Sequence, residues 1–184
     1  TMVLHGNIKY LESALQYASA VENAFDEQRR NSTPRSIAEY AEFVNTSLIL
    51  HACTGNKKYA DTSKEITSWI LKNQLESGAF KNTEKSHFSY TRGTSKVVEV
   101  LSLFNENTAE KYGADYRKEI MQAFTWLISM QYNESNTFFI DSREAKKYLG
   151  GFRHDYFNTE AWVDSAAHFI LAAARFCERE KNRD

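Results

Sequence analysis

The chain has 184 residues, of which 42% are hydrophobic and 14% aromatic, and its formal net charge is −1. This length and apolar content indicate one globular domain with a core and exclude a disordered chain. Because the charge is near zero and both signs are mixed, there is no electrostatic argument for nucleic-acid binding. No apolar run reaches the roughly 20 residues of a membrane span.

The first residues lack the charged start and the long apolar stretch of a signal peptide, which favours a soluble, cytoplasmic protein. The two cysteines, Cys53 and Cys177, each have apolar neighbours in a helical pattern. We therefore expect buried free thiols rather than a disulfide.

Apolar residues recur at steps of three and four in several long stretches, which is typical of amphipathic helices. The first helix is predicted over residues 7–30, with Asn7 as its cap. The second begins near Thr33 and Pro34, because a proline in the first turn loses no hydrogen bond, and it stops at Gly55.

The third predicted helix covers residues 57–75, the fourth 94–104 and the fifth 108–132. A helical turn is expected at 142–148, and a last helix follows Gly150 and Gly151 over residues 158–179. No segment shows convincing strand alternation, so the fold class is predicted to be all-α.

One phrase occurs twice, at a constant offset of 57 residues: Tyr59, Trp69 and Gln74 recur as Tyr116, Trp126 and Gln131. Repetition at a fixed period is typical of a fold built from one supersecondary unit. We predict a single domain of three antiparallel helical hairpins, over about residues 7–54, 57–105 and 108–181. The tryptophans should pack in the core, and the glutamine side chains should bond helix-end or loop carbonyls.

After each of these two helices comes a loop with glycine and an aromatic residue, and then a smaller, more apolar helix. This pattern resembles the repeats of the α/α-toroid superfamily, which includes terpenoid cyclases, protein prenyltransferases and, in architecture, the (α/α)-barrel glycan enzymes. The segment from Trp69 to Phe80 looks like the QW repeat of cyclases, and the segment from Gly150 to His168 looks like a closing repeat. The resemblance implies hairpins arranged as an arc or as part of a toroid.

A complete toroid has more hairpins than this chain has room for. The resemblance therefore implies open apolar edges, which more chain, a second copy or a partner domain would cover, unless the arc is packed differently. The acid motifs of terpenoid cyclases and the zinc ligands of prenyltransferases have no counterpart in this sequence. We expect no metal and no cofactor.

Polar side chains are concentrated in the two loops that precede the more apolar helices. In the resembling architecture such loops open at one end of the ring, where helix N-termini favour anions. Arginine can hold a carboxylate through two bonds, and tyrosine can stack on a sugar ring. The predicted binding residues are His87, Tyr90, Arg92 and Arg153, and the predicted proton-transfer residues are His154, Asp155 and Tyr156. The alternative is a solvated loop with Arg–Asp pairs.

Glu160, Asp164 and His168 recur at steps of four and are predicted to share one face of the last helix. Glu160 and Asp164 are further candidates for substrate binding, and Asp155 with Glu160 could form a carboxylate pair for glycoside cleavage. Asp164 and His168 have a spacing that could share a metal, but further ligands are not evident. Hydrogen bonds to neighbouring helices are the alternative for this face.

The favoured function is that of a carbohydrate-related domain, which binds or processes an acidic or neutral glycan in a bowl at the loop end. A non-catalytic helical-repeat module that binds a partner is the alternative, and an isoprenoid enzyme is the third. A glycan domain should gather the loop residues around one pocket, whereas a binding module should expose a continuous apolar patch.

Overall fold

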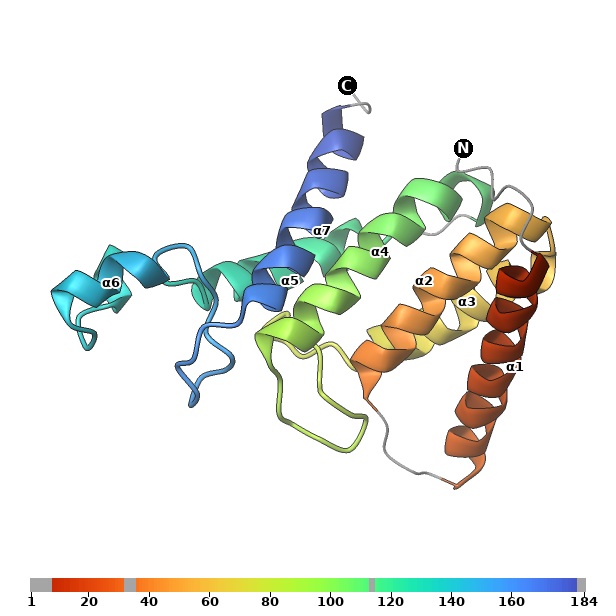
Figure 1. The fold of residues 1–184 in the computed structure, drawn as a ribbon, viewed down its shortest axis with the longest axis horizontal. Coiled ribbons are helices and arrows are strands. Elements are labelled where there is room, and N and C mark those ends of the chain that lie inside the picture. Colours follow the sequence, from red (N-terminus) through yellow and green to blue (C-terminus); the bar gives the residue numbers. More distant parts are fainter. Residues whose placement is uncertain (1–7, 32–35, 113–114, 182–184) are drawn as a thin grey trace.

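The computed structural model describes residues 8–31, 36–112 and 115–181, and these residues are mostly helical (Figure 1). Across the described residues there is no strand, and the few isolated bridges are antiparallel pairs of single residues. The all-α class is therefore confirmed. In chain order the elements are α1 (Ile8–Asn31), α2 (Ile37–Thr54), α3 (Lys57–Leu71), α4 (Thr91–Tyr112), α5 (Arg117–Ser129), the 3-10 turn η1 (Glu134–Asn136), α6 (Ser142–Tyr148) and α7 (Val163–Lys181).

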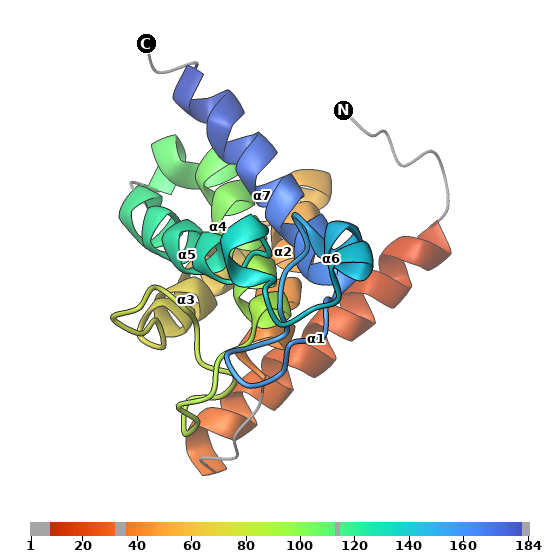
Figure 2. The same cartoon turned by 90° about the vertical axis from the view of Figure 1, so that its left-hand side faces the viewer.

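Helix α4 is the centre of the packing. It contacts α2 and α7, and it also contacts α5, while α2 contacts α1 and α3 (Figures 1 and 2). Between these helices lies one apolar core, which includes Phe43, Ile66, Leu101 and Leu127. Burial of such side chains supplies most of the stability of helix packing. The division into three hairpins and the arc or toroid arrangement stay predictions.

Several helix ends differ from the predicted ones. Helix α4 continues to Tyr112, so residues 108–112 belong to α4 and not to the fifth predicted helix. The reason is local, because the sequence from Phe104 to Tyr112 holds neither glycine nor proline to stop a helix. Helix α2 ends at the left-handed Gly55, as predicted, whereas the predicted caps Asn7 and Thr33 lie outside the described residues.

The last helix begins at Val163 rather than at residue 158. Residues 158–162 instead pair with residues 152–155: the His154 N–H donates to the Glu160 carbonyl at 2.9 Å, and Trp162 N–H donates to Phe152. Glu160 is therefore not on α7, and the predicted face shared by Glu160, Asp164 and His168 is wrong.

The glutamines of the repeated phrase make the same contact in both copies. The side-chain amide of Gln74 donates to the Gly78 carbonyl at 3.0 Å, and that of Gln131 donates to Gly150 at 2.9 Å. Each of these glycines has a positive φ, and a phenylalanine two residues later, Phe80 or Phe152, is fully buried and pairs with the glutamine backbone. The predicted role of the glutamines is confirmed.

The tryptophans also pack as predicted, although their partners differ between the copies. Trp69 makes edge contacts with Phe25 and Tyr40 at centroid distances of 5.6 and 5.3 Å. Trp126 is buried and donates a hydrogen bond from Nε1 to the hydroxyl of Tyr156 at 3.0 Å. The copies therefore share their glutamine turn but not the surroundings of their tryptophan.

The second copy carries an insertion between its glutamine and its glycine. Four residue steps separate Gln74 from Gly78, whereas nineteen separate Gln131 from Gly150. The additional chain, which we call the arm (residues 133–149), contains η1 and α6 and projects from the helices in Figure 1. Beyond the glycines the copies agree again, because thirteen steps lead from Gly78 to Thr91 and from Gly150 to Val163.

The prediction of buried cysteines is wrong, because Cys53 and Cys177 are free but exposed. Both lie in helices, on sides that face away from the core. None of the helices in the described part of the chain is long and apolar enough to cross a membrane.

Candidate functional site

The two polar loops lie against each other at the start of α4. The N–H of Thr91 donates to the His154 carbonyl at 2.8 Å, and its hydroxyl donates to the Arg153 carbonyl at 2.7 Å. The same hydroxyl lies 3.0 Å from that of Ser165 in α7. A single threonine at the first turn of α4 thus holds the loop 153–162 beside the loop 81–90, and the side chains of both loops meet there.

Aromatic rings from both loops form a row that we call the aromatic row: Phe88, Tyr90, His154 and Trp162. Phe88 and Tyr90 are nearly parallel, with centroids 5.9 Å apart. Tyr90 stacks on His154 at 5.5 Å, and His154 contacts Trp162 at 4.5 Å. Offset and tilted aromatic pairs at such distances are favourable, so the row fixes the orientation of the His154 ring.

His154 and Asp155 form a close pair within this loop. Nδ1 of His154 lies 2.6 Å from Oδ2 of Asp155, whose other oxygen accepts the N–H groups of Phe157 and Asn158 at 2.7 and 2.8 Å. Burial raises the pKa of Asp155, but those backbone bonds and His154 lower it more, so the pKa of Asp155 is below its usual value. A carboxylate that accepts the Nδ1 proton leaves Nε2 of His154 able to accept a proton from elsewhere.

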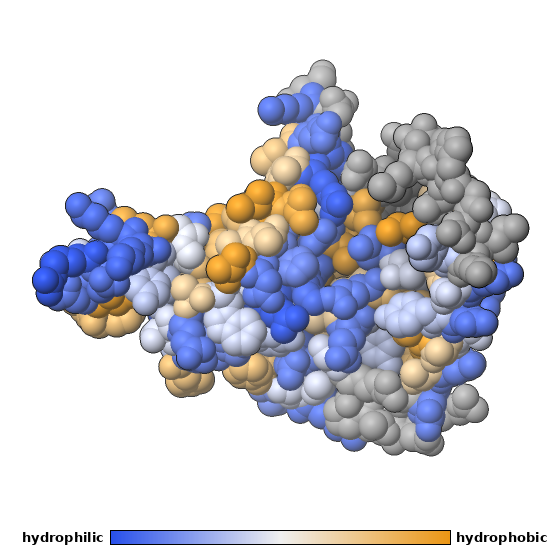
Figure 3. All heavy atoms as spheres, in the orientation of Figure 1, coloured by the Kyte–Doolittle hydropathy of each residue, from blue (hydrophilic) through white to orange (hydrophobic). Residues whose placement is uncertain are grey.

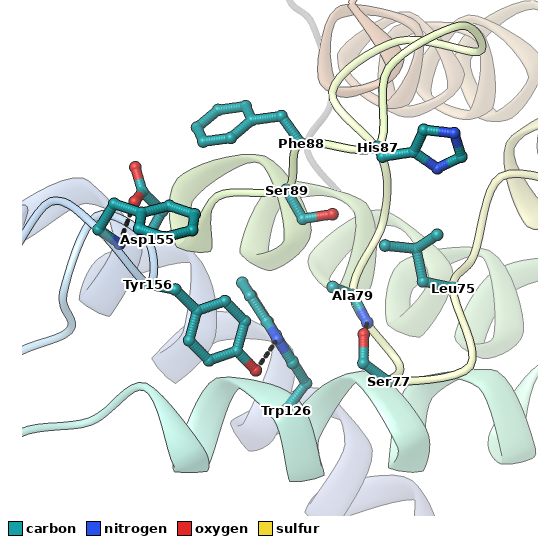
Figure 4. A pocket seen from close by; sticks show the side chains of 10 residues that line it. Leu75, Ser77, Ala79, His87, Phe88, Ser89, Trp126, Asp155 and Tyr156 are labelled. Carbon is teal, nitrogen blue, oxygen red and sulfur yellow. Dashed lines mark hydrogen bonds between the residues drawn. The ribbon is translucent and has the colours of Figure 1, made fainter.

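A small cavity of about 120 Å³ lies between the two repeats. Its lining combines residues of the first copy, such as Leu75 and Ser89, with Trp126, Asp155 and Tyr156 of the second (Figure 4). The hydroxyl of Tyr156 points to the indole of Trp126 in this view, and His87 lies at the rim. This cavity brings together three of the predicted site residues, His87, Asp155 and Tyr156.

A larger and more open groove, of about 590 Å³, lies between the arm and the loop 158–162. Its lining includes Tyr132, Phe139, Tyr148, Trp162 and Glu160. The hydroxyl of Tyr132 donates to the carbonyl of Thr159 and so ties the base of the arm to this loop. Burial raises the pKa of Tyr132 by more than Arg153 and the bond to Thr159 lower it, so the pKa of this hydroxyl lies above its usual value.

Trp162 connects the groove to the His154–Asp155 pair. One part of its ring contacts His154, and the side chain also lines the groove. Its Nε1 lies 3.4 Å from Oε2 of Glu160. A ligand on this ring would therefore have a carboxylate and an imidazole nearby.

The two predicted arginines line neither of these hollows. Nε of Arg92 lies 2.6 Å from Oδ2 of Asp164, and Nη2 of Arg153 donates to the Ser129 carbonyl at 3.3 Å. His168 of α7 lies 2.6 Å from Glu99 of α4, which also accepts from Arg175. Helix-to-helix pairing, the alternative for Asp164 and His168, is thus confirmed. Within the described residues no three His, Cys, Asp or Glu side chains are grouped as metal ligands.

Of the residues that line the groove, only Glu160 was predicted as a site residue. Tyr132, Tyr148 and Trp162 were not among the predicted site residues, although Trp162 had a signal. Trp162 directly precedes α7, as Tyr90 directly precedes α4. Each lies twelve residues after the glycine of its copy, Gly150 or Gly78. Tyr148 lies on the arm, which has no counterpart in the first copy, so the repeat could not point to it.

Comparison with known proteins does not assign this chain to a family. No family model matches the sequence, and no curated protein matches it. Among solved structures, a polysaccharide lyase aligns over 84% of this chain with 15% identity and a TM-score of 0.45. The chain spans 66% of that structure, just under two thirds. This similarity is too low to assign a shared fold or an activity.

Proposed function

We propose that the protein binds a glycan in the groove between the arm and the loop 158–162, with one sugar ring stacked on Trp162. The observation that carries this proposal is the composition of the groove, in which several aromatic rings surround Glu160 in an open hollow of about 590 Å³. Aromatic side chains with a polar edge suit a ligand that has both an apolar face and hydroxyl groups. Ligand sites commonly have volumes of about 300–1,000 Å³.

The charge of the groove favours a neutral glycan over an acidic one. Glu160 is a charged lining residue, while Arg92 and Arg153 are bound to Asp164 and to the Ser129 carbonyl. A uronate placed beside Glu160 would meet like charge, and neither arginine lines the groove to bind the uronate directly. Sugar hydroxyls, in contrast, can donate to the carboxylate.

If the bound glycan is also processed, His154 is the residue best arranged to move a proton. Asp155 holds its Nδ1, and the aromatic row holds its ring against Trp162, which itself lines the groove. Proton transfer between His154 and a ligand in the groove would therefore pass through a bridging water at the edge of Trp162. A positioned imidazole whose other nitrogen is held by a carboxylate is a common general base. The hydroxyl of Tyr156 accepts a hydrogen bond from Nε1 of Trp126. Its side chain lines the smaller cavity and not the groove, so it is a second candidate only for a ligand that reaches that cavity.

A calorimetric screen tests binding and its charge preference together. Matched neutral and uronic-acid oligosaccharides of the same length should be titrated into the wild type and into Glu160→Gln. We expect the wild type to bind a neutral oligosaccharide. We also expect Glu160→Gln to bind the uronic-acid oligosaccharide with higher affinity than the wild type does. Binding of neither class would contradict the proposal.

Product analysis separates binding from catalysis. Any oligosaccharide that binds should be incubated with the wild type and with His154→Ala, and the products measured by mass spectrometry. Cleavage that is lost in His154→Ala, with binding retained, would support proton transfer by His154. Binding without cleavage by the wild type would show that the protein binds the glycan and does not process it.

The alternative, an interaction module, also has an observation in its favour. Five small or apolar residues of α7 are exposed and line neither hollow: Val163, Ala167, Ile170, Ala174 and Cys177. Glycan binding and association through α7 are compatible with each other.

A further inference from the structure

The small cavity between the two repeats contains a hydroxyl group that lacks a partner. Oγ of Ser89 is buried, and none of the residues that the structure describes forms a hydrogen bond with it. Ser89 lines the cavity, and Figure 4 shows its hydroxyl turned to the side that Leu75 lines. A buried hydroxyl without a partner is unfavourable, so a ligand with a hydrogen-bond acceptor at this point would bind there favourably.

The rest of the cavity is mostly apolar, and exposed aromatic rings surround its mouth. Ala79 and Trp126 line it as buried residues, whereas Phe88, Tyr156 and Phe157 line it with much of their surface exposed, Phe157 at 94%. The bond from Nε1 of Trp126 to the Tyr156 hydroxyl holds one of these rings in place. Apolar side chains also gather over α7 in Figure 3, but the residues of that helix line neither hollow. Rings around an apolar hollow suit a sugar ring that carries a small apolar substituent.

The charge of Asp155 indicates that the substituent is uncharged. Asp155 lines the cavity, and its lowered pKa keeps it ionised at neutral pH. An anionic group in the cavity would therefore meet like charge. The oxygens of Asp155 already bond to Nδ1 of His154 and to the N–H groups of Phe157 and Asn158. A cationic group would lose its water in an apolar hollow and find a carboxylate that is already bonded.

The size of the cavity narrows the choice among uncharged groups. An apolar protein cavity of about 150 Å³ holds one benzene molecule, so a cavity of about 120 Å³ takes a somewhat smaller group. A hydroxymethyl group would leave most of the apolar wall without contacts. An acetamido group instead has a methyl for the wall beside Ala79 and Trp126, and a carbonyl oxygen that can accept from Ser89.

We propose that this cavity binds the acetamido group of an N-acetylated amino sugar, with its carbonyl oxygen accepting a hydrogen bond from Ser89 and its sugar ring against the aromatic mouth. The inference rests on the proposed glycan function and names the class of glycan. The His154 ring contacts Trp162 of the groove at 4.5 Å and lies 6.3 Å from Phe88 of the cavity. The two hollows therefore lie close enough for one oligosaccharide to occupy both and to pass the His154–Asp155 pair.

Calorimetry with matched β-1,4-linked trimers tests the acetamido group separately from the groove. The trimers of glucose and of N-acetylglucosamine differ only in the substituent at the 2-position. We expect the wild type to bind the N-acetylated trimer about tenfold more tightly than the glucose trimer. Equal affinities would overturn the acetamido site and leave the glycan groove standing, whereas binding of neither trimer would contradict the groove and with it this site.

The glucosamine trimer, which carries ammonium groups in place of the acetamido groups, is the control for charge. It should bind more weakly than the N-acetylated trimer. If it binds as tightly, attraction to Asp155 explains the preference, and the acetamido site is overturned.

Variants of Ser89 locate the preference in the cavity. Ser89→Ala removes the donor, so the affinity for the N-acetylated trimer should fall by about three- to tenfold, and that for the glucose trimer should not change. Its stability to urea should not fall, because the hydroxyl has no partner in the protein to lose. Ser68→Ala is the matched control, since the exposed Ser68 hydroxyl donates to the Lys64 carbonyl of its own helix, and both affinities should stay unchanged.

Ser89→Leu fills the cavity instead of only removing the hydroxyl. It should abolish the preference for the N-acetylated trimer and keep the binding of the glucose trimer. Circular dichroism should confirm that both Ser89 variants are folded. An unchanged preference in folded Ser89→Ala and Ser89→Leu would overturn the proposal.

Discussion

The side-chain amide of Gln74 donates a hydrogen bond to the backbone carbonyl of Glu119 at 2.9 Å. This bond connects the end of α3 in the first copy of the repeat to α5 in the second. The same amide also donates to the Gly78 carbonyl, so one side chain fixes both its own turn and the neighbouring copy. The cavity between the copies lies beside this turn, with Leu75 and Ser77 in its lining.

Replacing the two glutamines should have unequal effects. Gln74→Ala removes two hydrogen bonds that are partly buried, and Gln131→Ala removes one that is exposed. At about 0.5–1.5 kcal/mol for each bond, we expect losses of roughly 1–3 and 0.5–1.5 kcal/mol in the free energy of unfolding. Urea denaturation of the two variants measures both values. Equal losses would show that the bond to Glu119 contributes nothing.

The two glycines with positive φ that follow the glutamines form a second matched pair. A Cβ at Gly78 would lie 2.1 Å from the carbonyl oxygen of Gln122, whereas a Cβ at Gly150 would meet no atom within 4 Å. Gly150→Ala carries only the cost of a left-handed residue, about 1–3 kcal/mol. Gly78→Ala must also displace the backbone of α5, so it should unfold at a clearly lower urea concentration. Similar midpoints for the two variants would contradict the close approach of Gly78 to α5.

The charge of Asp155 should stabilise the fold at neutral pH. Its pKa is lowered in the folded state, so its contribution is present above the pKa of the unfolded chain and is lost as the pH falls through the folded pKa. The difference in unfolding free energy between wild type and Asp155→Asn should therefore be largest near neutral pH and shrink in acid. Urea titrations across that range measure it, and a difference that does not depend on pH would contradict the role of the carboxylate.

The contribution of Tyr116 to the free energy of unfolding should depend on pH in the opposite sense, because it is lost at high pH. Burial and the nearby Glu119 raise its pKa from 10.0 to about 12. Its contribution is fully present below the pKa of the unfolded tyrosine and is lost as the pH rises through the folded pKa. The wild type should therefore lose more stability than Tyr116→Phe between these two values. Thermal unfolding at several alkaline pH values tests this, and parallel losses in the two proteins would count against it.

The repeat allowed part of the fold to be predicted from the sequence. The role of Gln74 and Gln131 followed from their place in the repeated phrase, since each helix end needs partners for its free carbonyls. The pairing of Gln131 with Gly150, nineteen residues away, did not follow from spacing. The helix α6 was predicted with its observed bounds. The start of α7 was not, because residues 158–162 have ordinary helix-compatible side chains, and only pairing with residues 152–155 holds them extended.

The candidate site was predictable only where the two copies correspond. The loops of both copies do lie together, as the contacts of Tyr90 and Thr91 with His154 show. The groove depends on the arm, which occurs in one copy only, so periodicity gave no information about Tyr148. The pairing of Arg92 with Asp164 depends on how α4 and α7 are aligned, which spacing along one chain does not determine.

Calorimetry on Trp162→Ala tests the glycan proposal most directly, with Phe138→Ala as the matched control. Phe138 is an arm aromatic that is 86% exposed and does not line the groove. For a neutral oligosaccharide that the wild type binds, Trp162→Ala should weaken binding by about tenfold or more, which corresponds to ~1.4 kcal/mol, and Phe138→Ala should leave it unchanged. Unchanged affinity in Trp162→Ala would contradict a sugar ring stacked on this side chain and with it the assignment of the groove.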